Sequence, residues 1–224
     1  MNELMKASTR ARALLAATFA TFALAADGAA QSGDVALVHA LMLDRELVVS
    51  PADAQPVRAE LGHRLRDRDA VFTSANTRAA IRFTDDGSLV RLNPNSQLQV
   101  LATGERSALA KTIELEFGEL WARVTRRPET DFQVRTPAGV AAVKGTELLV
   151  LVGQDGATTV MTLEGEVEFT NDGGAATITA GNRVSVTSIA DPPVAQPITD
   201  AEREALGELV EEEEDPSTEV QIRL

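Results

Sequence analysis

The sequence contains no cysteine. Disulfide bonds, thiolate catalysis and cysteine-ligated zinc or iron–sulfur sites are therefore excluded, and the fold must rest on packing and strand pairing alone. Aromatic residues are also scarce, at 4% of the chain, with one Trp and no Tyr. Aliphatic side chains must therefore fill the core, and a surface that stacks sugar rings on aromatic side chains is poorly supplied.

Positive charge is in short supply as well. The 224 residues include 21 Lys and Arg against 34 Asp and Glu, which gives a formal net charge of −13. Phosphate binding needs clustered Lys and Arg, so we predict no nucleic-acid partner, and an anionic membrane surface is disfavoured for the same reason. Hydrophobic residues make up 44% of the chain, enough for a real core, and the length fits one domain with appendages.

Histidine, the commonest acid–base residue, is limited to His39 and His63. Neither has ligand spacing to a second histidine, so both are expected to be structural or surface residues. No nucleophile-elbow, phosphate-loop or metalloprotease motif is present, and Asp85-Asp86-Gly87-Ser88 lacks calcium-loop spacing. We therefore predict no enzyme, with no catalytic, metal-binding or cofactor-binding residue and no cofactor. A glycosidase-like carboxylate pair is the catalytic alternative that stays open, although no pair stands out.

The N-terminus has the pattern of a secretory signal peptide. Residues 13–26 are an uncharged run rich in Ala, Leu and Phe, and small residues suit cleavage after Ala25 or Ala30. The basic residues before the run are Lys6, Arg10 and Arg12. We expect residues 1–30 to be the signal peptide of a periplasmic or secreted protein, with a core helix or an uncleaved anchor as alternatives. No later apolar run is long enough to span a bilayer, so no stable membrane span is expected after cleavage.

Residues 35–189 are dominated by a period of two, which is typical of strands. Asp86-Gly87 and Asp155-Gly156 separate such strands and predict hairpins. Residues 148–152 are continuously apolar and are expected to be buried on both faces. Lys144-Gly145-Thr146-Glu147, just before them, is either a phosphate-binding segment or a turn; we favour the turn because no glycine-rich loop precedes it.

The predicted fold is therefore all-β, a single domain of many short strands and hairpins with a short C-terminal helix. Similar segments begin at Gly118, Gly165 and Gly181, where a glycine and a polar residue precede a strand. This loose repeat favours a rolled or solenoid-like sheet, and a sandwich is the alternative.

The C-terminal part changes character. Residues 190–199 are expected to form a Pro-rich linker, and residues 200–224 an acidic tail with a short helix at 200–210, capped by Thr199 or Asp200. Residues 200–215 hold nine acidic residues and one arginine, a net charge of −8. Such a block is usually solvated, so we expect the tail to be separable from the fold.

Several segments, taken in order, resemble the FecR domain family. Residues 65–73 and 78–96 resemble its first half, residues 132–137 and 140–147 its central signature, and residues 163–167 and 180–182 its closing turns. The resemblance covers roughly residues 45–188. The signature residues, which we expect to be structural, are Thr136, Pro137, Lys144, Gly145, Thr146, Asp86, Gly87 and Gly165.

The resemblance implies an all-β extracytoplasmic domain at residues 35–189. In the best-known members this domain relays a signal between an outer-membrane siderophore transducer and a cytoplasmic sigma factor. This sequence departs from that arrangement, because we find neither the N-terminal anti-sigma region nor a spanning helix. We therefore expect a non-catalytic interaction or sensory-accessory module of the bacterial envelope that binds an envelope protein, for example by strand addition. The alternative is a structural or glycan- or cell-wall-binding envelope protein.

Overall fold

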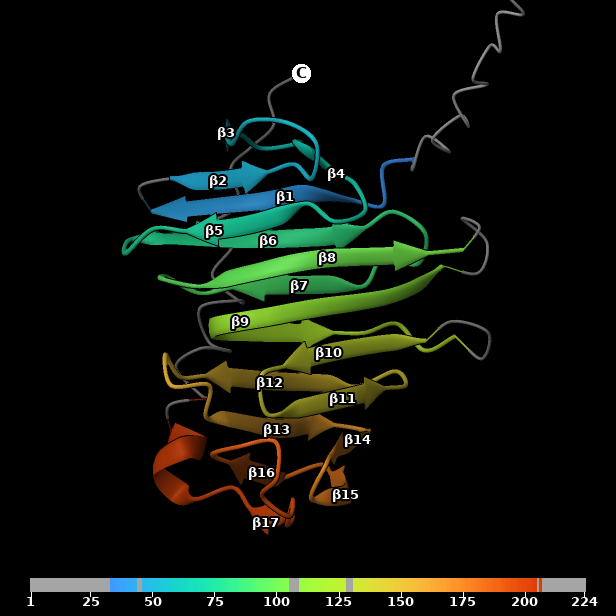
Figure 1. Cartoon of the computed structure of the whole chain (residues 1–224), viewed down its shortest axis with the longest axis vertical. Helices are drawn as coiled ribbons and strands as arrows, with labels where there is room; N and C mark the ends of the chain where they lie inside the picture. The colour runs from blue at the N-terminus through green and yellow to red at the C-terminus, as the bar shows by residue number, and fades with distance from the viewer. Residues whose placement is uncertain (1–32, 44–45, 105–108, 128–130, 205, 207–224) are drawn as a thin grey trace, which may run out of the picture. The chain divides into compact units, whose positions relative to one another are not determined.

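The computed structural model describes residues 33–43, 46–104, 109–127, 131–204 and 206. They form one continuous sheet of seventeen strands (Figure 1). The strands are β1 (Ala36–Leu43), β2 (Leu47–Ser50), β3 (Val57–Ala59), β4 (Arg64–Leu65), β5 (Ala70–Thr73), β6 (Thr77–Phe83), β7 (Leu89–Leu92), β8 (Gln97–Thr103), β9 (Ala110–Arg123), β10 (Phe132–Thr136), β11 (Gly139–Val143), β12 (Glu147–Val152), β13 (Thr158–Glu164), β14 (Glu166–Asn171), β15 (Gly174–Thr179), β16 (Asn182–Val186) and β17 (Gln196–Pro197).

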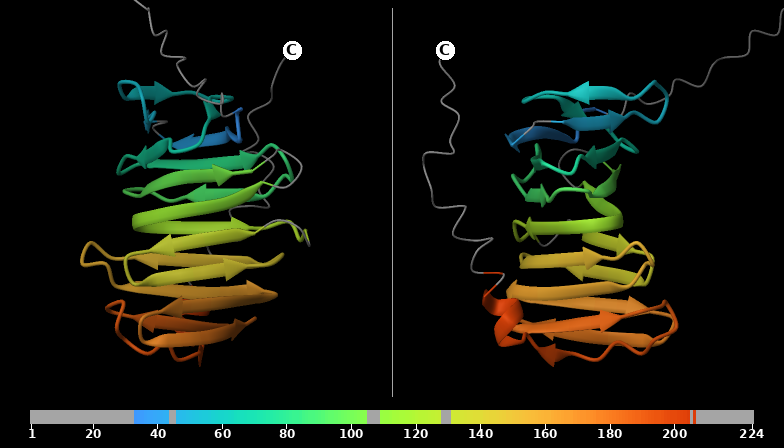
Figure 2. Two further views of the ribbon diagram at one scale, coloured as in Figure 1. Left: turned by 45° about the vertical axis from the view of Figure 1, so that its right-hand side comes forward. Right: turned by 90° about the vertical axis from the view of Figure 1, so that its left-hand side faces the viewer.

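The sheet folds over on itself into two layers (Figure 2). Layer 1 contains, in spatial order, β4, β1, β6, β7, the second half of β9, β12, β13, β16 and β17. Layer 2 contains β3, β2, β5, β8, the first half of β9, β10, β11, β14 and β15. Every pairing is antiparallel except that of β9 with β10. The predicted all-β class is confirmed, and of the alternatives left open the rolled sheet describes the arrangement.

Strand β9 passes from layer 2 to layer 1 at Gly118. This residue has a φ of +103°, and a Cβ built on it would lie 2.1 Å from Ser96 Oγ. Only glycine combines this backbone conformation with so close an approach. The strand can therefore pair with β8 before the bend and with β7 and β12 after it.

Alternating residues of both layers form one buried cluster between them, which we call the inner core. Its largest fully buried apolar members come from strands of both layers. They are Phe83, Phe169, Leu47, Leu65, Ile81, Leu92, Leu98, Ile113, Leu115, Leu120 and Leu148. Most of the longer strands contribute every second residue, so the period of two seen in the sequence is the origin of this core.

A second, smaller cluster lies on the outward face of layer 1, and we call it the outer cluster. It consists of Trp121, Leu149, Met161, Ile198 and Leu206. The expectation that residues 148–152 are buried on both faces is met at every position except the half-buried Leu151. The inner core covers one face of this strand and the outer cluster covers the other.

The chain continues to pair and pack after residue 189. Strand β17 lies within the segment expected to be a linker and pairs with β16. Residues 200–204 and 206 are helical, and Thr199 caps this helix, because its Oγ1 accepts a 3.3 Å hydrogen bond from the Glu202 backbone N–H. The Glu202 side chain reaches back and accepts a 2.8 Å hydrogen bond from the Thr199 backbone N–H at Oε2. The expected signal peptide and acidic residues 211–215 lie outside the described residues. Within the described part of the chain, no helix is long and apolar enough to cross a membrane.

Candidate interaction surface

The predicted turn at Lys144-Gly145-Thr146 connects β11 of layer 2 to β12 of layer 1. Gly145 has a φ of +72°, and a Cβ built there would lie 2.3 Å from Arg126 Cβ. Lys144 is exposed. This is the geometry of a tightly packed corner, as the turn interpretation expects.

Thr146 and Gly165 hold two corners together. The Thr146 side chain is 3% exposed and its Oγ1 donates a 3.0 Å hydrogen bond to the carbonyl of Glu166. Gly165 has a φ of +82°, and its Cβ position lies 3.0 Å from the Gly145 carbonyl oxygen. The crossing from layer 2 to layer 1 after β11 therefore packs directly on the return crossing after β13.

Thr136 and Pro137 lie at the other end of β11, in the hairpin that joins it to β10. Thr136 Oγ1 donates to the Gly139 carbonyl at 3.1 Å and accepts from Thr158 Oγ1 at 3.1 Å. A Cβ on Gly156 would meet the Pro137 ring at 3.2 Å. The signature residues described so far therefore lie in two groups at opposite ends of β11, and the contacts of each group are made within or between turns.

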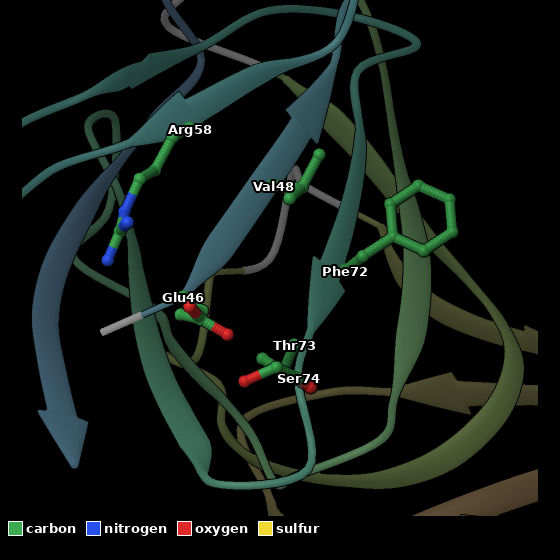
Figure 3. A pocket seen from close by; sticks show the side chains of 6 residues that line it. All are labelled: Glu46, Val48, Arg58, Phe72, Thr73 and Ser74. Atoms are coloured by element: carbon green, nitrogen blue, oxygen red, sulfur yellow. The ribbon is translucent and has the colours of Figure 1, made fainter. Parts of the chain in front are cut away.

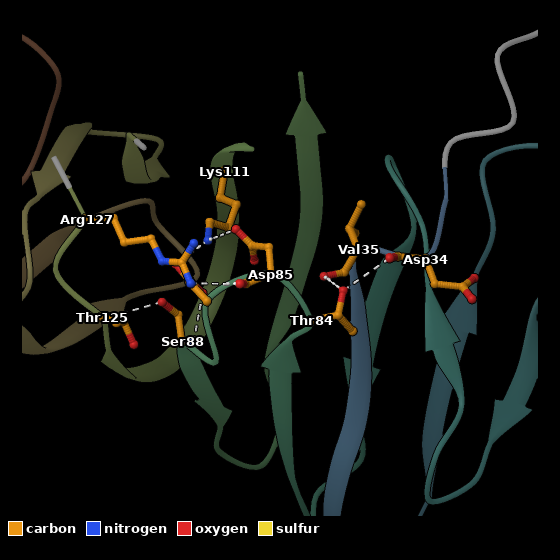
Figure 4. A network of polar contacts seen from close by, with 9 residues as sticks. Asp34, Val35, Thr84, Asp85, Ser88, Lys111, Thr125 and Arg127 are labelled. Carbon is orange, nitrogen blue, oxygen red and sulfur yellow. Dashed lines mark hydrogen bonds and ion pairs between the residues drawn. The ribbon is translucent and has the colours of Figure 1, made fainter. Parts of the chain in front are cut away.

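Asp86 and Gly87 form the β6–β7 hairpin, where Asp85 and Asp86 bind the side chain of Lys111 (Figure 4). Lys111 Nζ lies 2.8 Å from Asp85 Oδ2 and also contacts Asp86 Oδ2, and all three side chains are at most 2% exposed. Burial tends to raise the pKa of Asp86, but hydrogen bonds from Lys111 and Ser88 outweigh it and hold that pKa below its usual value. The hairpin belongs to layer 1 and Lys111 to layer 2, so this ion cluster joins the layers.

Lys111 was not among the residues expected to matter. The signal was nevertheless present, because Lys111 shares the inward-facing alternation of Ile113 and Leu115. An inward lysine requires a buried anion, and the Asp-Asp hairpin is the one that meets it. The described residues hold no group of three His, Cys, Asp or Glu side chains suited to a metal ion.

A shallow hollow of about 390 Å³ lies on the outward face of layer 2, near the end of the sheet formed by β2, β3 and β5 (Figure 3). Val48 lies opposite Arg58 of β3 and opposite Phe72 of β5, so these three side chains stand in one row across the strands. The hollow is lined by Glu46, Val48, Arg58, Phe72, Thr73 and Ser74. Its lining is therefore apolar at Val48 and Phe72 and polar or charged at the other four residues.

Strand β3 borders the hollow and is the edge of layer 2. It pairs with β2, and no pairing is found on its other side within the described residues. Three large apolar side chains are exposed around it: Val48 at 38%, Val57 at 41% and Leu61 at 49%. An open strand edge beside exposed apolar side chains has what a peptide needs to add as a further strand, namely main-chain partners and side-chain contacts. We call β3 and the hollow the edge site.

Comparisons with known proteins agree with this fold. Residues 69–168 match the family model described as "FecR protein". This range contains all eight signature residues. Two crystal structures of a "putative anti-sigma factor" from Parabacteroides distasonis, at 1.65 and 2.50 Å resolution, superpose with TM-scores of 0.53 and 0.52 at 20% and 19% sequence identity. The search of curated proteins gives no match.

The structural matches cover 61% of this chain and 63% and 62% of the two crystallised chains. This chain therefore matches less than two thirds of the length of each of them. At this level of identity the likeness shows the fold. The resemblance to FecR domains that the sequence suggested is thereby confirmed.

Proposed function

Starting from a chain that carries a FecR domain, we propose that this protein is a non-catalytic interaction module of bacterial envelope signalling, and that its partner binds at the edge site. The single observation that carries this proposal is the open edge of β3 beside the exposed Val48 and Val57. The signalling context is supported by the family match and by the name of the structural neighbours.

The partner we propose is an envelope protein that presents an extended segment. Its backbone would pair with β3 and extend layer 2 by one strand. One apolar side chain would cover Val48 and Phe72, and an acidic group would suit Arg58 at the margin of the hollow. Aliphatic contact of this kind supplies affinity, while the register of the added strand supplies selectivity.

Capture from envelope extract with the purified chain tests the proposal. Val48→Glu places a charge in the hollow and is expected to reduce capture of a specific protein by about tenfold or more, because the charge must be desolvated on binding. The matched control is Thr177→Glu, which places the same charge on β15, the opposite edge strand of the same layer. Capture should survive this change.

Three results would contradict the proposal. Equal capture by both variants would remove the edge site as the binding surface. Retention on purified murein with no captured protein would favour the glycan- or cell-wall-binding alternative. Turnover of an envelope substrate by the purified chain would contradict a non-catalytic role.

The extracytoplasmic location is proposed from residues 1–30 and has its own test. Sequencing of the mature N-terminus is expected to begin near Ala26 or Gln31, because cleavage follows a small residue. A soluble cytoplasmic protein that begins with Met1 would overturn the location.

A further inference from the structure

The amine of Lys111 lies in the interior between the two layers, where a lysine is seldom found. Its side chain is 1% exposed, and its Nζ lies 5.2 Å from the centre of the Phe83 ring. Phe83 is itself 1% exposed and packs edge-on against Phe132, with the ring centres 5.8 Å apart. The amine is therefore enclosed among buried side chains and held away from bulk water.

Two carboxyl groups meet this amine inside the protein. Lys111 Nζ donates a 2.8 Å hydrogen bond to Asp85 Oδ2 and also contacts Asp86 Oδ2 (Figure 4). The side chains of Asp85 and Asp86 are 2% and 1% exposed. One amine and two carboxyl groups thus share a buried space, close to the separation of about 3–3.5 Å from which positioned groups react.

The two carboxyl groups are held differently. Asp86 Oδ1 accepts a 2.8 Å hydrogen bond from the Ser88 backbone N–H, while Asp86 Oδ2 contacts Lys111. Burial acts to raise the pKa of Asp86, but the bonds from Lys111 and Ser88 outweigh it and keep this carboxyl ionised. Asp85 Oδ1, by contrast, is buried and has no hydrogen-bond partner among the described residues. Asp86 is therefore the better base, and Asp85, with one oxygen unpartnered, is the better site of attack.

The hairpin that carries both carboxyl groups is fixed in place. Ser88 is 0% exposed, and its Oγ accepts a 3.1 Å hydrogen bond from the Thr125 backbone N–H. Arg127 Nη2 donates a 3.0 Å hydrogen bond to the Asp85 carbonyl oxygen (Figure 4). The carboxyl groups are therefore held against Lys111 before any reaction, which removes much of the entropy cost of bringing the groups together.

We propose that Lys111 and Asp85 form an intramolecular amide (isopeptide) bond in the folded protein, with Asp86 as the proton relay. The Lys111 ammonium loses one proton to Asp86, and the electron pair of Nζ attacks Cγ of Asp85. Asp86 passes this proton, and then a second proton from the nitrogen, to Asp85 Oδ2. The bond between Cγ and Oδ2 breaks and one water leaves. The product is an amide of Nζ, Cγ and Oδ1, and Asp86 is again a carboxylate.

The bond removes two of the three buried charges and joins the two layers covalently. Lys111 belongs to β9 in layer 2, and Asp85 follows β6 in layer 1, 26 residues earlier in the chain. A chain without cysteine cannot make such a cross-link through a disulfide. Like a disulfide, the amide closes a loop and so constrains the unfolded chain. Burial favours the reaction, because the water that is released leaves an interior closed to solvent.

Mass spectrometry of the purified full chain tests this bond. The linked protein is expected to be lighter than its residues, counted from its own N-terminus, by about 18 Da, the mass of one water. Trypsin does not cleave after an acylated lysine, so residues 83–91 and residues 107–123 should be released as one linked peptide.

Two results with the wild-type chain would overturn the proposal. One is the full mass, with residues 83–91 and 107–111 released as separate peptides. The other is a loss of water confined to residues 83–91, which an imide at Asp86-Gly87 would give without any link to Lys111.

Single substitutions assign the roles. Asp85→Ala removes the carboxyl that is attacked, so the chain should keep its full mass. Asp86→Asn leaves Lys111 and Asp85 in place but cannot relay protons, so the linked fraction should fall about tenfold or more. The matched control is Asp155→Asn in the other Asp-Gly hairpin, where Asp155 Oδ1 accepts a 3.1 Å hydrogen bond from the Ala157 backbone N–H. This variant should be linked to the same extent as the wild type.

Circular dichroism confirms that each variant is folded, and the peptide map of the wild type decides the question even where a variant does not fold. A linked peptide in Asp85→Ala, or equal linked fractions in Asp86→Asn and Asp155→Asn, would contradict the proposal.

Discussion

The two apolar clusters lie on opposite faces of layer 1 and are covered by different parts of the chain. The inner core draws on both layers and is enclosed by the sheet itself. The outer cluster has three residues on neighbouring strands, and Ile198 and Leu206 complete it from outside the main strands of the sheet. Leu148 and Leu149, adjacent on β12, belong to one cluster each and are 0% and 4% exposed.

Leu148 and Leu149 are thus similarly buried, but the two clusters that bury them depend on different parts of the chain. The inner core is a property of the folded sheet and disappears only when the sheet unfolds. The outer cluster depends on Ile198 and Leu206 of the C-terminal segment, whose detachment would leave the pairings within both layers up to β16 intact. We take the inner core to be responsible for the fold and the outer cluster for holding Ile198 and Leu206 of the C-terminal segment against layer 1.

The largest expected effect concerns the buried ion cluster of Lys111, Asp85 and Asp86, which joins the two layers. Lys111→Met leaves Asp85 and Asp86 buried without their cation and should cost about 3–5 kcal/mol of unfolding free energy. Arg135→Met breaks the exposed pair with Glu114 and should cost less than about 1 kcal/mol. Urea unfolding measures both. Similar small losses would show that the ion cluster does not hold the layers together.

Truncating the two adjacent leucines separates the clusters directly. Leu148→Ala should cost about 2–5 kcal/mol, because the inner core cannot close around the cavity. Leu149→Ala should cost less, about 1–2 kcal/mol, because the covering segment can shift or detach. Thermal or urea unfolding of the two variants gives the comparison. A larger loss for Leu149→Ala would mean that the outer cluster is as much a part of the fold as the inner core.

Gly145→Val tests the corner where the chain passes between the layers. A β-branched side chain at a φ of +72° is strained, and its Cβ would collide with Arg126, so we expect a loss of about 1–3 kcal/mol. Lys144→Val, at the exposed neighbour in the same turn, is the control and should have little effect. If stability holds in Gly145→Val while partner capture fails, the signature is part of the binding surface instead.

The smallest effects are those of pH, and they differ in sign between the two faces. The pKa of Asp86 is lowered in the folded protein, so its contribution is present above the pKa of the unfolded chain and is lost as the pH falls through the folded value. Burial raises the pKa of Glu119 on the outward face, against the opposing effects of Asn93 and Arg78. Stability therefore falls as the pH rises through the pKa of Glu119.

Unfolding free energies measured from pH 3 to pH 7 should resolve the two groups. Asp86→Asn should flatten the acid side of the profile, while Glu119→Gln should be neutral or slightly stabilising near pH 7. Identical profiles for the wild type and Asp86→Asn would contradict the assignment.

Much of the fold follows from local pattern. The period of two fixes which residues enter the inner core, and Asp86-Gly87 and Asp155-Gly156 lie in the turns between paired strands, as predicted. The capping of the C-terminal helix by Thr199 was also readable. These features depend on near neighbours in the sequence, so the sequence alone predicts them.

The unpredicted features depend on distant parts of the chain. Whether Trp121 faces solvent is decided by Ile198 and Leu206, about 80 residues later, and no periodicity links them. The edge site likewise arises because no described strand pairs with the outer side of β3, a consequence of topology. The pairing of Lys111 with Asp85 and Asp86 could not be predicted from the sequence, because it depends on how the two layers lie over each other.

Trp121 allows the most direct test of the central claim, because it is the only Trp of the chain and 8% exposed in the outer cluster. Its fluorescence should be compared between the full chain and a chain that ends at Pro197. We predict that the shortened protein still unfolds cooperatively, while its emission shifts to the red and acrylamide quenches it more strongly. Unchanged emission and quenching, or loss of the folded state, would contradict the division into a self-sufficient inner core and a tail-dependent outer cluster.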